Sequence, residues 1–190
     1  AIDQQLFDEV FGEGAVKDEN EFREKISESL KAQFIVDSDY KFLQDVRKYC
    51  EDKVGTLTFP EALLKRVMEN NNKDKEPDYV EKNFNLSIKE LAWHLMKEQL
   101  VEANNVKIED SDVKEAAKEA ARAQFAQYGM TNVPDEYLEN YASDMLKKKE
   151  YVDNLVDRSI DRKLTEALKG VVKLNNKDVT LEDFNEMMRG

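Results

Sequence analysis

Residues 18–53 contain neither glycine nor proline, and Gly14 and Gly55 lie on either side of them. Asp18 can cap the start of a helix here, and Glu21 is expected to accept a hydrogen bond from the N–H of Asp18 in return. A continuous helix of this length would measure about 50 Å, since each residue adds about 1.5 Å. Most helices in compact domains are shorter. We call residues 18–53 the spine segment.

The apolar face of the spine segment changes direction along its length. Its first half carries an i, i+4 series, which is Phe22, Ile26, Leu30 and Phe34. The series of its second half is rotated well around the helix and consists of Leu43, Val46 and Cys50. One helix with two faces can pack against two different partners. We interpret the spine segment as one long helix, and a break near residues 36–39 is the alternative.

Composition narrows the classes of fold and partner. The 190 residues include 29 Lys and Arg and 41 Asp and Glu, which gives a net charge of −12. Such an acidic chain is poorly suited to phosphate backbones or anionic lipids, so neither nucleic acid nor a membrane is an expected direct partner. Six glycines and three prolines are too few for an all-β protein. A 41% hydrophobic and 37% charged chain suits an elongated all-α fold with narrow apolar stripes.

Helical spacing, caps and glycines divide the rest of the chain. The predicted helices cover residues 6–11, 61–71, 78–104, 111–128 and 135–169, followed by a short one after Thr180. A break at residues 147–149 is an open alternative within the fifth. Gly129 and Gly170 are the expected helix ends, and Thr180 the expected cap of the last helix, with Asp183 three residues later.

Residues that carry chemistry are sparse. His94 is the only histidine and Cys50 the only cysteine, so a paired Glu-x-x-His di-iron set or a complete zinc set cannot be assembled from them. Residues 109–112 are acidic, but they lack the glycine and closing glutamate of a calcium loop and are better explained as a helix cap. The glycines are scattered, so there is no phosphate-binding loop. We therefore expect no catalytic residue, no metal site and no cofactor.

An apolar cluster is predicted where the 111–128 helix turns into the next one. Its members are Phe125, Tyr128, Met130, Val133, Tyr137, Tyr141 and Met145. Helix tips are usually polar, whereas aromatic and flexible methionine side chains suit an adaptable binding surface. The alternative is that they close a small core of their own. Trp93, on the second apolar face of the 78–104 helix, is a further candidate contact for a partner.

Four segments together resemble a known family. They are Leu-Phe-Asp-Glu-Val-Phe-Gly at residues 6–12, Phe-Arg-Glu-Lys at 22–25 after Glu21, Phe-Pro-Glu-Ala-Leu-Leu at 59–64, and the closing stretch at 173–188. Their order resembles the C-terminal domain of bacterial trigger factor, the ribosome-associated chaperone, over nearly the whole chain. The likeness is one of pattern, without a catalytic signature.

The resemblance implies an all-α domain with a body, residues 1–59 and 171–190, and two helical-hairpin arms, residues 60–104 and 105–170. It implies a cytoplasmic, ATP-independent chaperone that holds unfolded or nascent polypeptides in a helical cradle. The family's ribosome-docking and peptidyl-prolyl isomerase domains are not in this sequence. We therefore expect a fragment without enzyme activity that reaches the ribosome only through the missing domain. A weak homodimer stays open.

Two alternative functions are compatible with the same residues. A periplasmic chaperone of the SurA type also combines such helices with isomerase domains. A helical scaffold with one fixed protein partner would form a single stoichiometric complex, where a chaperone forms many weak ones.

Overall fold

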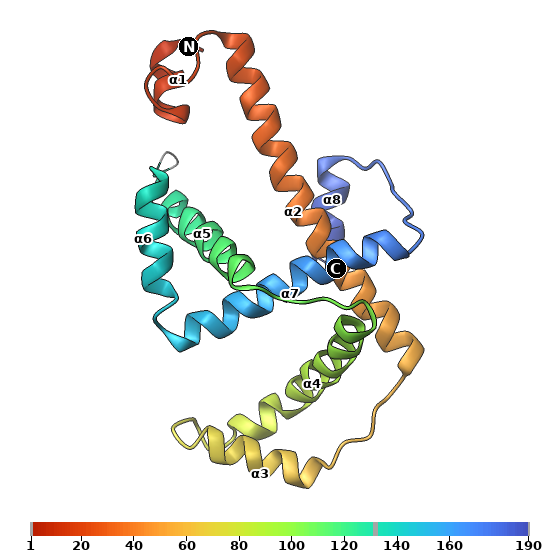
Figure 1. The fold of residues 1–190 in the computed structure, drawn as a ribbon. Coiled ribbons are helices and arrows are strands. Elements are labelled where there is room, and N and C mark those ends of the chain that lie inside the picture. Colours follow the sequence, from red (N-terminus) through yellow and green to blue (C-terminus); the bar gives the residue numbers. More distant parts are fainter. Residues whose placement is uncertain (1, 131–132, 190) are drawn as a thin grey trace. The chain divides into compact units, whose positions relative to one another are not determined.

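The protein is all-α, as predicted. The computed structural model describes residues 2–130 and 133–189, and within them it contains eight helices and no strand (Figure 1). The helices are α1 (Gln4–Phe11), α2 (Glu19–Val54), α3 (Glu61–Asn71), α4 (Tyr79–Ala103), α5 (Asp110–Gln127), α6 (Asp135–Met145), α7 (Lys149–Val171) and α8 (Leu181–Arg189).

The spine segment is one uninterrupted helix, α2, so the alternative of a break near residues 36–39 is wrong. Asp18 caps it as expected, because its Oδ1 accepts the N–H of Glu21 at 2.9 Å. The return bond differs from the prediction. The Oε2 of Glu21 accepts the N–H of Lys17 at 2.9 Å, one residue before Asp18. The glutamate therefore satisfies a donor of the chain that leads into the helix.

The N-terminal helix α1 covers the first turns of α2. The ring of Phe22 lies 4.8 Å from that of Phe7 and 5.5 Å from that of Phe11, measured between centroids. Phe7 and Val16 are buried there. Aromatic pairs at these separations contribute about 0.5–1.5 kcal/mol beyond the area they bury. Residues 6–11 therefore use the spine segment as their packing surface.

The chain divides into two compact units. Unit 1 comprises Ala1–Lys41 and Val106–Gly190, and unit 2 comprises Phe42–Asn105. This division groups residues 42–59 with residues 60–104, whereas the sequence assigned them to the body. The predicted body and arms stay a prediction.

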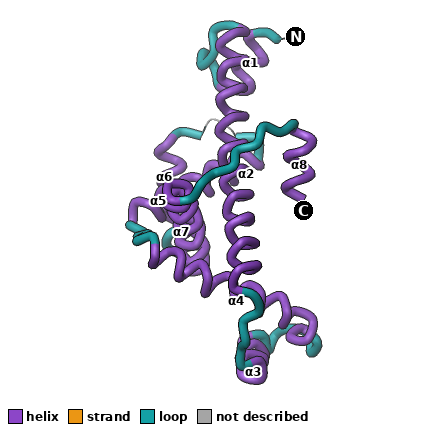
Figure 2. Tube along the Cα trace, turned by 90° about the vertical axis from the view of Figure 1, so that its right-hand side faces the viewer, coloured by secondary structure: helices purple, strands orange, loops and turns teal. Residues whose placement is uncertain are grey.

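The core of unit 1 lies where α5 meets α6 and α7. In both views α5 lies beside these two helices (Figures 1 and 2). Ala116, Ala117, Ala142 and Leu155 form the buried cluster, and Val113, Ala120 and Leu146 pack against it. Alanine on α5 favours helix and lets the neighbouring backbones approach closely. The alanine-rich composition of residues 111–128 thus serves packing.

Unit 2 packs the end of α2 with α3 and α4 around a small core. Its buried apolar side chains are Leu43, Phe84, Trp93 and Met96. Three of them belong to α4. Phe84 lies on one apolar face of this helix, and Trp93 and Met96 lie on the second. Leu86 and Leu95 of the same two faces are exposed. The helix is therefore apolar on two faces and buries only part of each.

The region predicted as a single helix over residues 135–169 is interrupted. α6 ends at Met145 and α7 begins at Lys149, close to the expected break. Gly170 does not end the helix, contrary to prediction, since α7 continues to Val171. Gly170 is absent from the glycines with positive φ, and the backbone turns extended only at Val172. The glycine that commonly ends a helix takes the left-handed conformation, which Gly170 does not.

The last helix is capped as predicted, because Thr180 Oγ1 accepts the N–H of Asp183 at 3.2 Å. α8 belongs to unit 1 and contacts α2 there. The ring of Phe184 meets that of Phe34 edge-on, with centroids 6.0 Å apart.

Candidate functional site

The predicted apolar cluster begins at a sharp end of α5. Gly129 has φ +79°, which is left-handed, and its N–H donates to the carbonyl of Ala126 at 2.9 Å. The N–H of Met130 donates to the carbonyl of Phe125 at 3.0 Å. These two bonds form the Schellman arrangement that satisfies the last carbonyls of a helix. Gly129 is thus the helix stop that the sequence predicted, and the chain leaves α5 immediately after it.

Four of the seven cluster residues are half-buried, and two of these, Phe125 and Tyr141, join α5 to α6. The rings of Phe125 and Tyr141 meet at 5.3 Å with a 60° angle between their planes. The hydroxyl of Tyr141 donates to Oε1 of Gln124 at 2.9 Å. Val133 and Met145 are also partly covered. Phe125 and Tyr141 thus help to close the α5–α6 hairpin, in line with the alternative interpretation of the cluster.

The other three cluster residues face solvent. Tyr128 is 72% exposed, Tyr137 65% and Met130 52%. We call these three side chains the tip triad. Exposing large apolar side chains gains nothing for the stability of the fold, and it leaves them available for contact with a partner. The tip therefore combines a packed inner part with an outer part that is free to make contacts.

Trp93 lies elsewhere and is not exposed. It belongs to unit 2, is only 9% exposed, and the guanidinium of Arg47 lies 5.8 Å from its ring centre. Arg47 Nη2 donates to Glu90 at 2.8 Å and Arg47 Nε to Glu51 at 2.9 Å. The hydrogen bond to Glu90, followed by that to Glu51, raises the pKa of Arg47, against the opposing effect of burial. Trp93 is a packing residue in this structure, so we leave it out of the binding surface.

The sequence did not single out a second exposed apolar surface, on α2 within unit 1. Leu30 and Phe34, which were expected to pack inward, are exposed, and so are Ile35 and Val36 beside them. Leu30 and Phe34, together with Phe22 and Ile26, line an open groove of about 440 Å³. The i, i+4 spacing that predicted a packed stripe is equally the pattern of an open one. Nothing in the spacing distinguishes the two cases.

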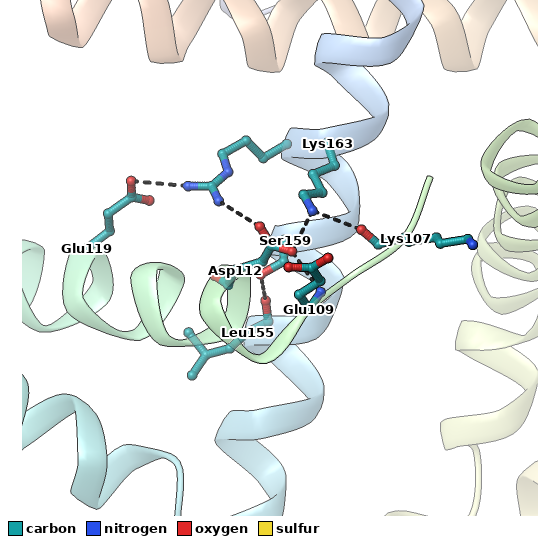
Figure 3. Close-up of polar contacts among 8 residues, drawn as sticks. Lys107, Glu109, Asp112, Glu119, Leu155, Ser159 and Lys163 are labelled. Carbon is teal, nitrogen blue, oxygen red and sulfur yellow. Dashed lines mark hydrogen bonds and ion pairs between the residues drawn. The ribbon is translucent and has the colours of Figure 1, made fainter. Parts of the chain in front are cut away.

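A polar network fixes the start of α5 against α7 (Figure 3). Asp112 Oδ2 accepts the N–H of Glu109 at 2.7 Å and Nζ of Lys163 at 2.6 Å. Lys163 also donates to the carbonyl of Lys107 at 2.9 Å. The Lys163 bond first, and then the Glu109 N–H, lower the pKa of Asp112. The acidic stretch 109–112 therefore caps α5, as the sequence indicated.

Beside this network, the hydroxyl of Ser159 donates to the carbonyl of Leu155 at 2.8 Å and approaches the carbonyl of Asp112 at 3.3 Å (Figure 3). Ser159 is almost fully buried. A buried hydroxyl whose hydrogen is donated to a backbone carbonyl is a structural group.

Reactive and metal-binding groups are not gathered anywhere in the described part of the chain. No three His, Cys, Asp or Glu side chains there could hold a metal ion together. Burial, and to a lesser extent Glu51, raise the pKa of the Cys50 thiol, which disfavours the reactive thiolate. His94 is exposed, with Nε2 3.4 Å from Glu98. None of the described helices is long and apolar enough to cross a membrane.

Comparison with known protein families gives a match over most of the chain. Residues 38–188 match the family described as "Probable trigger factor, C-terminal domain". No curated protein and no solved structure matches the chain. The match covers most of the chain, including α3 to α7 and the whole tip.

Proposed function

Because this chain belongs to the trigger factor C-terminal domain family, we propose that it binds unfolded or nascent polypeptides and thereby acts as an ATP-independent chaperone domain. Family membership supports a chaperone-type role, and this domain is not the isomerase domain of the family. In this proposal the protein works in the cytoplasm, and any contact with the ribosome is made by another part of the parent protein. Proline isomerisation would reside in the family's separate isomerase domain.

The tip triad is the observation that carries this proposal. Tyr128, Met130 and Tyr137 expose large apolar surfaces while the neighbouring Phe125–Tyr141 pair holds the hairpin together. Tyrosine offers an apolar ring with a polar end, and methionine adapts its shape to different partners. Such a surface can bury apolar segments of many sequences weakly and release them without ATP.

An aggregation assay tests the function. A chemically unfolded reporter protein is diluted into buffer with increasing amounts of this chain, and light scattering is followed. We expect scattering to fall as the chain approaches equimolar amounts. No effect at a several-fold excess would contradict the chaperone function.

A matched pair of variants locates the activity. Tyr128→Ser/Met130→Ser/Tyr137→Ser removes the tip triad, and Tyr49→Ser/Val67→Ser/Leu86→Ser removes three exposed apolar side chains of unit 2. Both should keep the helical signal in circular dichroism, because exposed substitutions usually change stability by less than about 0.5 kcal/mol each. Only the variant without the tip triad should lose most of its protection of the reporter against aggregation. Equal loss in both variants would mean that the tip has no special part in it.

A further inference from the structure

A second groove of unit 1 differs in chemistry from the tip. It has a volume of about 570 Å³ and lies between α2, α5 and α7. Its alanine floor is Ala116, Ala120 and Ala123 of α5, at i, i+4 and i+7, with Ala32 from α2. The small side chains leave room for the backbone and short side chains of an extended segment.

Three arginines stand around this floor. Arg122 comes from α5, and Arg158 and Arg162 come from α7. Glu119 is the one carboxylate among the described lining residues, so the groove carries a net charge of about +2 inside a chain of net charge −12. A local positive surface of this kind attracts anionic groups selectively.

The guanidinium groups keep donors free for a ligand. Arg158 is exposed and makes no ion pair with any described residue. Arg122 reaches Asp135 only at 3.8 Å, and Arg162 lies 3.5 Å from Glu119 and 3.8 Å from Asp112. These separations exceed the 2.7–2.9 Å of a charge-assisted hydrogen bond. Arginine binds carboxylates in a planar, two-bond geometry that these loose pairs do not use.

We propose that this arginine-rimmed groove binds acidic segments of unfolded polypeptide, in which Asp or Glu alternates with small apolar residues. The inference rests on the proposed chaperone function and names one class of client for it. The carboxylates would pair with Arg122 and Arg158 while the small side chains cover the alanine floor. A nucleic acid fits less well, because its continuous negative charge is repelled by the chain as a whole and gains nothing from alanine methyl groups.

Two fluorescently labelled peptides test the proposal by anisotropy. They have equal length and the same small apolar residues, with glutamate in one and lysine in the other. The wild-type chain should bind the glutamate peptide more tightly, and added salt should weaken that binding. A preference for the lysine peptide would overturn the proposal.

Charge variants assign the binding to the groove. Arg122→Gln/Arg158→Gln should lower the affinity for the glutamate peptide by about tenfold, because charge-assisted hydrogen bonds are stronger than neutral ones. Arg66→Gln/Lys89→Gln makes the same charge change at exposed positions of unit 2 and should alter affinity by less than about twofold at moderate salt. Equal weakening by both pairs would show a general charge effect and contradict the groove.

A third variant keeps the charges and fills the floor. Ala123→Leu, at an exposed position of the alanine floor, should also lower the affinity for the glutamate peptide. Unchanged affinity would contradict the assignment of the peptide to this groove. A short single-stranded DNA that competes as well as the glutamate peptide would replace the polypeptide assignment with a general anion site. Protection of the reporter in the aggregation assay is scored separately. If it persists while the groove variants have no effect on peptide binding, the chaperone function stands and the groove assignment fails.

Discussion

The rings of Phe125 and Tyr141 lie 5.3 Å apart, nearly edge to face, and join the end of α5 to α6. Tyr128, three residues after Phe125, is 72% exposed. One short segment therefore holds both a packing aromatic residue and an exposed one. Stability and binding should respond to different substitutions there.

Phe125→Ala should lower the free energy of unfolding by about 1–3 kcal/mol, less than for a fully buried phenylalanine because the ring is only half-buried. Tyr128→Ala should change it by less than about 0.5 kcal/mol. Urea unfolding followed by circular dichroism measures both. A larger loss for Tyr128→Ala than for Phe125→Ala would show that the assignment of inner and outer residues is reversed.

Two glycines should respond to alanine in opposite directions. Gly129 has φ +79°, so Gly129→Ala should destabilise the end of α5 by about 1–2 kcal/mol, although no atom lies within 4 Å of the added methyl group. Gly170 lies in the last turn of α7 with similar open space and without a positive φ, so Gly170→Ala should stabilise by less than about 1 kcal/mol. Thermal unfolding compares the two variants. A stabilising Gly129→Ala would exclude the left-handed helix end.

Asp112 should make the stability of unit 1 depend on pH in the acidic range. Its pKa is lowered in the folded state, chiefly by Lys163, so the folded protein binds fewer protons at this group than the unfolded chain does. The stabilisation is therefore complete above about pH 5 and is lost as the pH falls through the folded pKa. The wild type should exceed Asp112→Asn in stability by a constant amount near neutrality, and this difference should shrink below about pH 4.

Urea unfolding of both proteins between pH 7 and pH 3 measures that difference. Asp110→Asn is the control, because it makes the same charge change on the same first turn of α5 and leaves the contact between Asp112 and Lys163 in place. A difference between wild type and Asp112→Asn that grows on acidification would contradict the assigned direction of the pKa shift.

Trp93 provides a spectroscopic probe of unit 2, since it is the only tryptophan and is buried there. Its fluorescence should be blue-shifted in the native protein. Arg47→Gln should shift the emission to longer wavelength by removing the cation above the ring and the bonds to Glu90. An unchanged spectrum would contradict the contact between Arg47 and Trp93.

Most of the helices could be predicted because their determinants are local. Asp18, Gly129 and Thr180 each act through bonds to residues at most four positions away, which the sequence displays directly. Gly170 shows the limit of this reasoning. A glycine can end a helix or continue it, and the choice depends on a backbone conformation that its identity does not fix.

Burial was harder to predict, because it depends on which surfaces meet. Trp93 and Leu86 both lie on the second apolar face of α4, yet one is buried and the other exposed. Phe34 sits on a regular apolar stripe of α2 and still faces solvent for more than a third of its surface. An apolar stripe indicates which residues share a face of the helix. Whether another helix covers that face depends on tertiary packing, which the stripe does not determine.

Site-specific photo-crosslinking tests the central claim most directly. The crosslinking amino acid p-benzoylphenylalanine replaces Tyr128 in one protein and Tyr49, an equally aromatic and exposed residue of unit 2, in another. Each is irradiated with an unfolded reporter and with the same reporter in its folded state. We predict strong adducts at position 128 with the unfolded reporter and weak ones at position 49 or with the folded reporter. No adduct at position 128, or equal adducts at both positions, would contradict the tip triad as the polypeptide-binding surface.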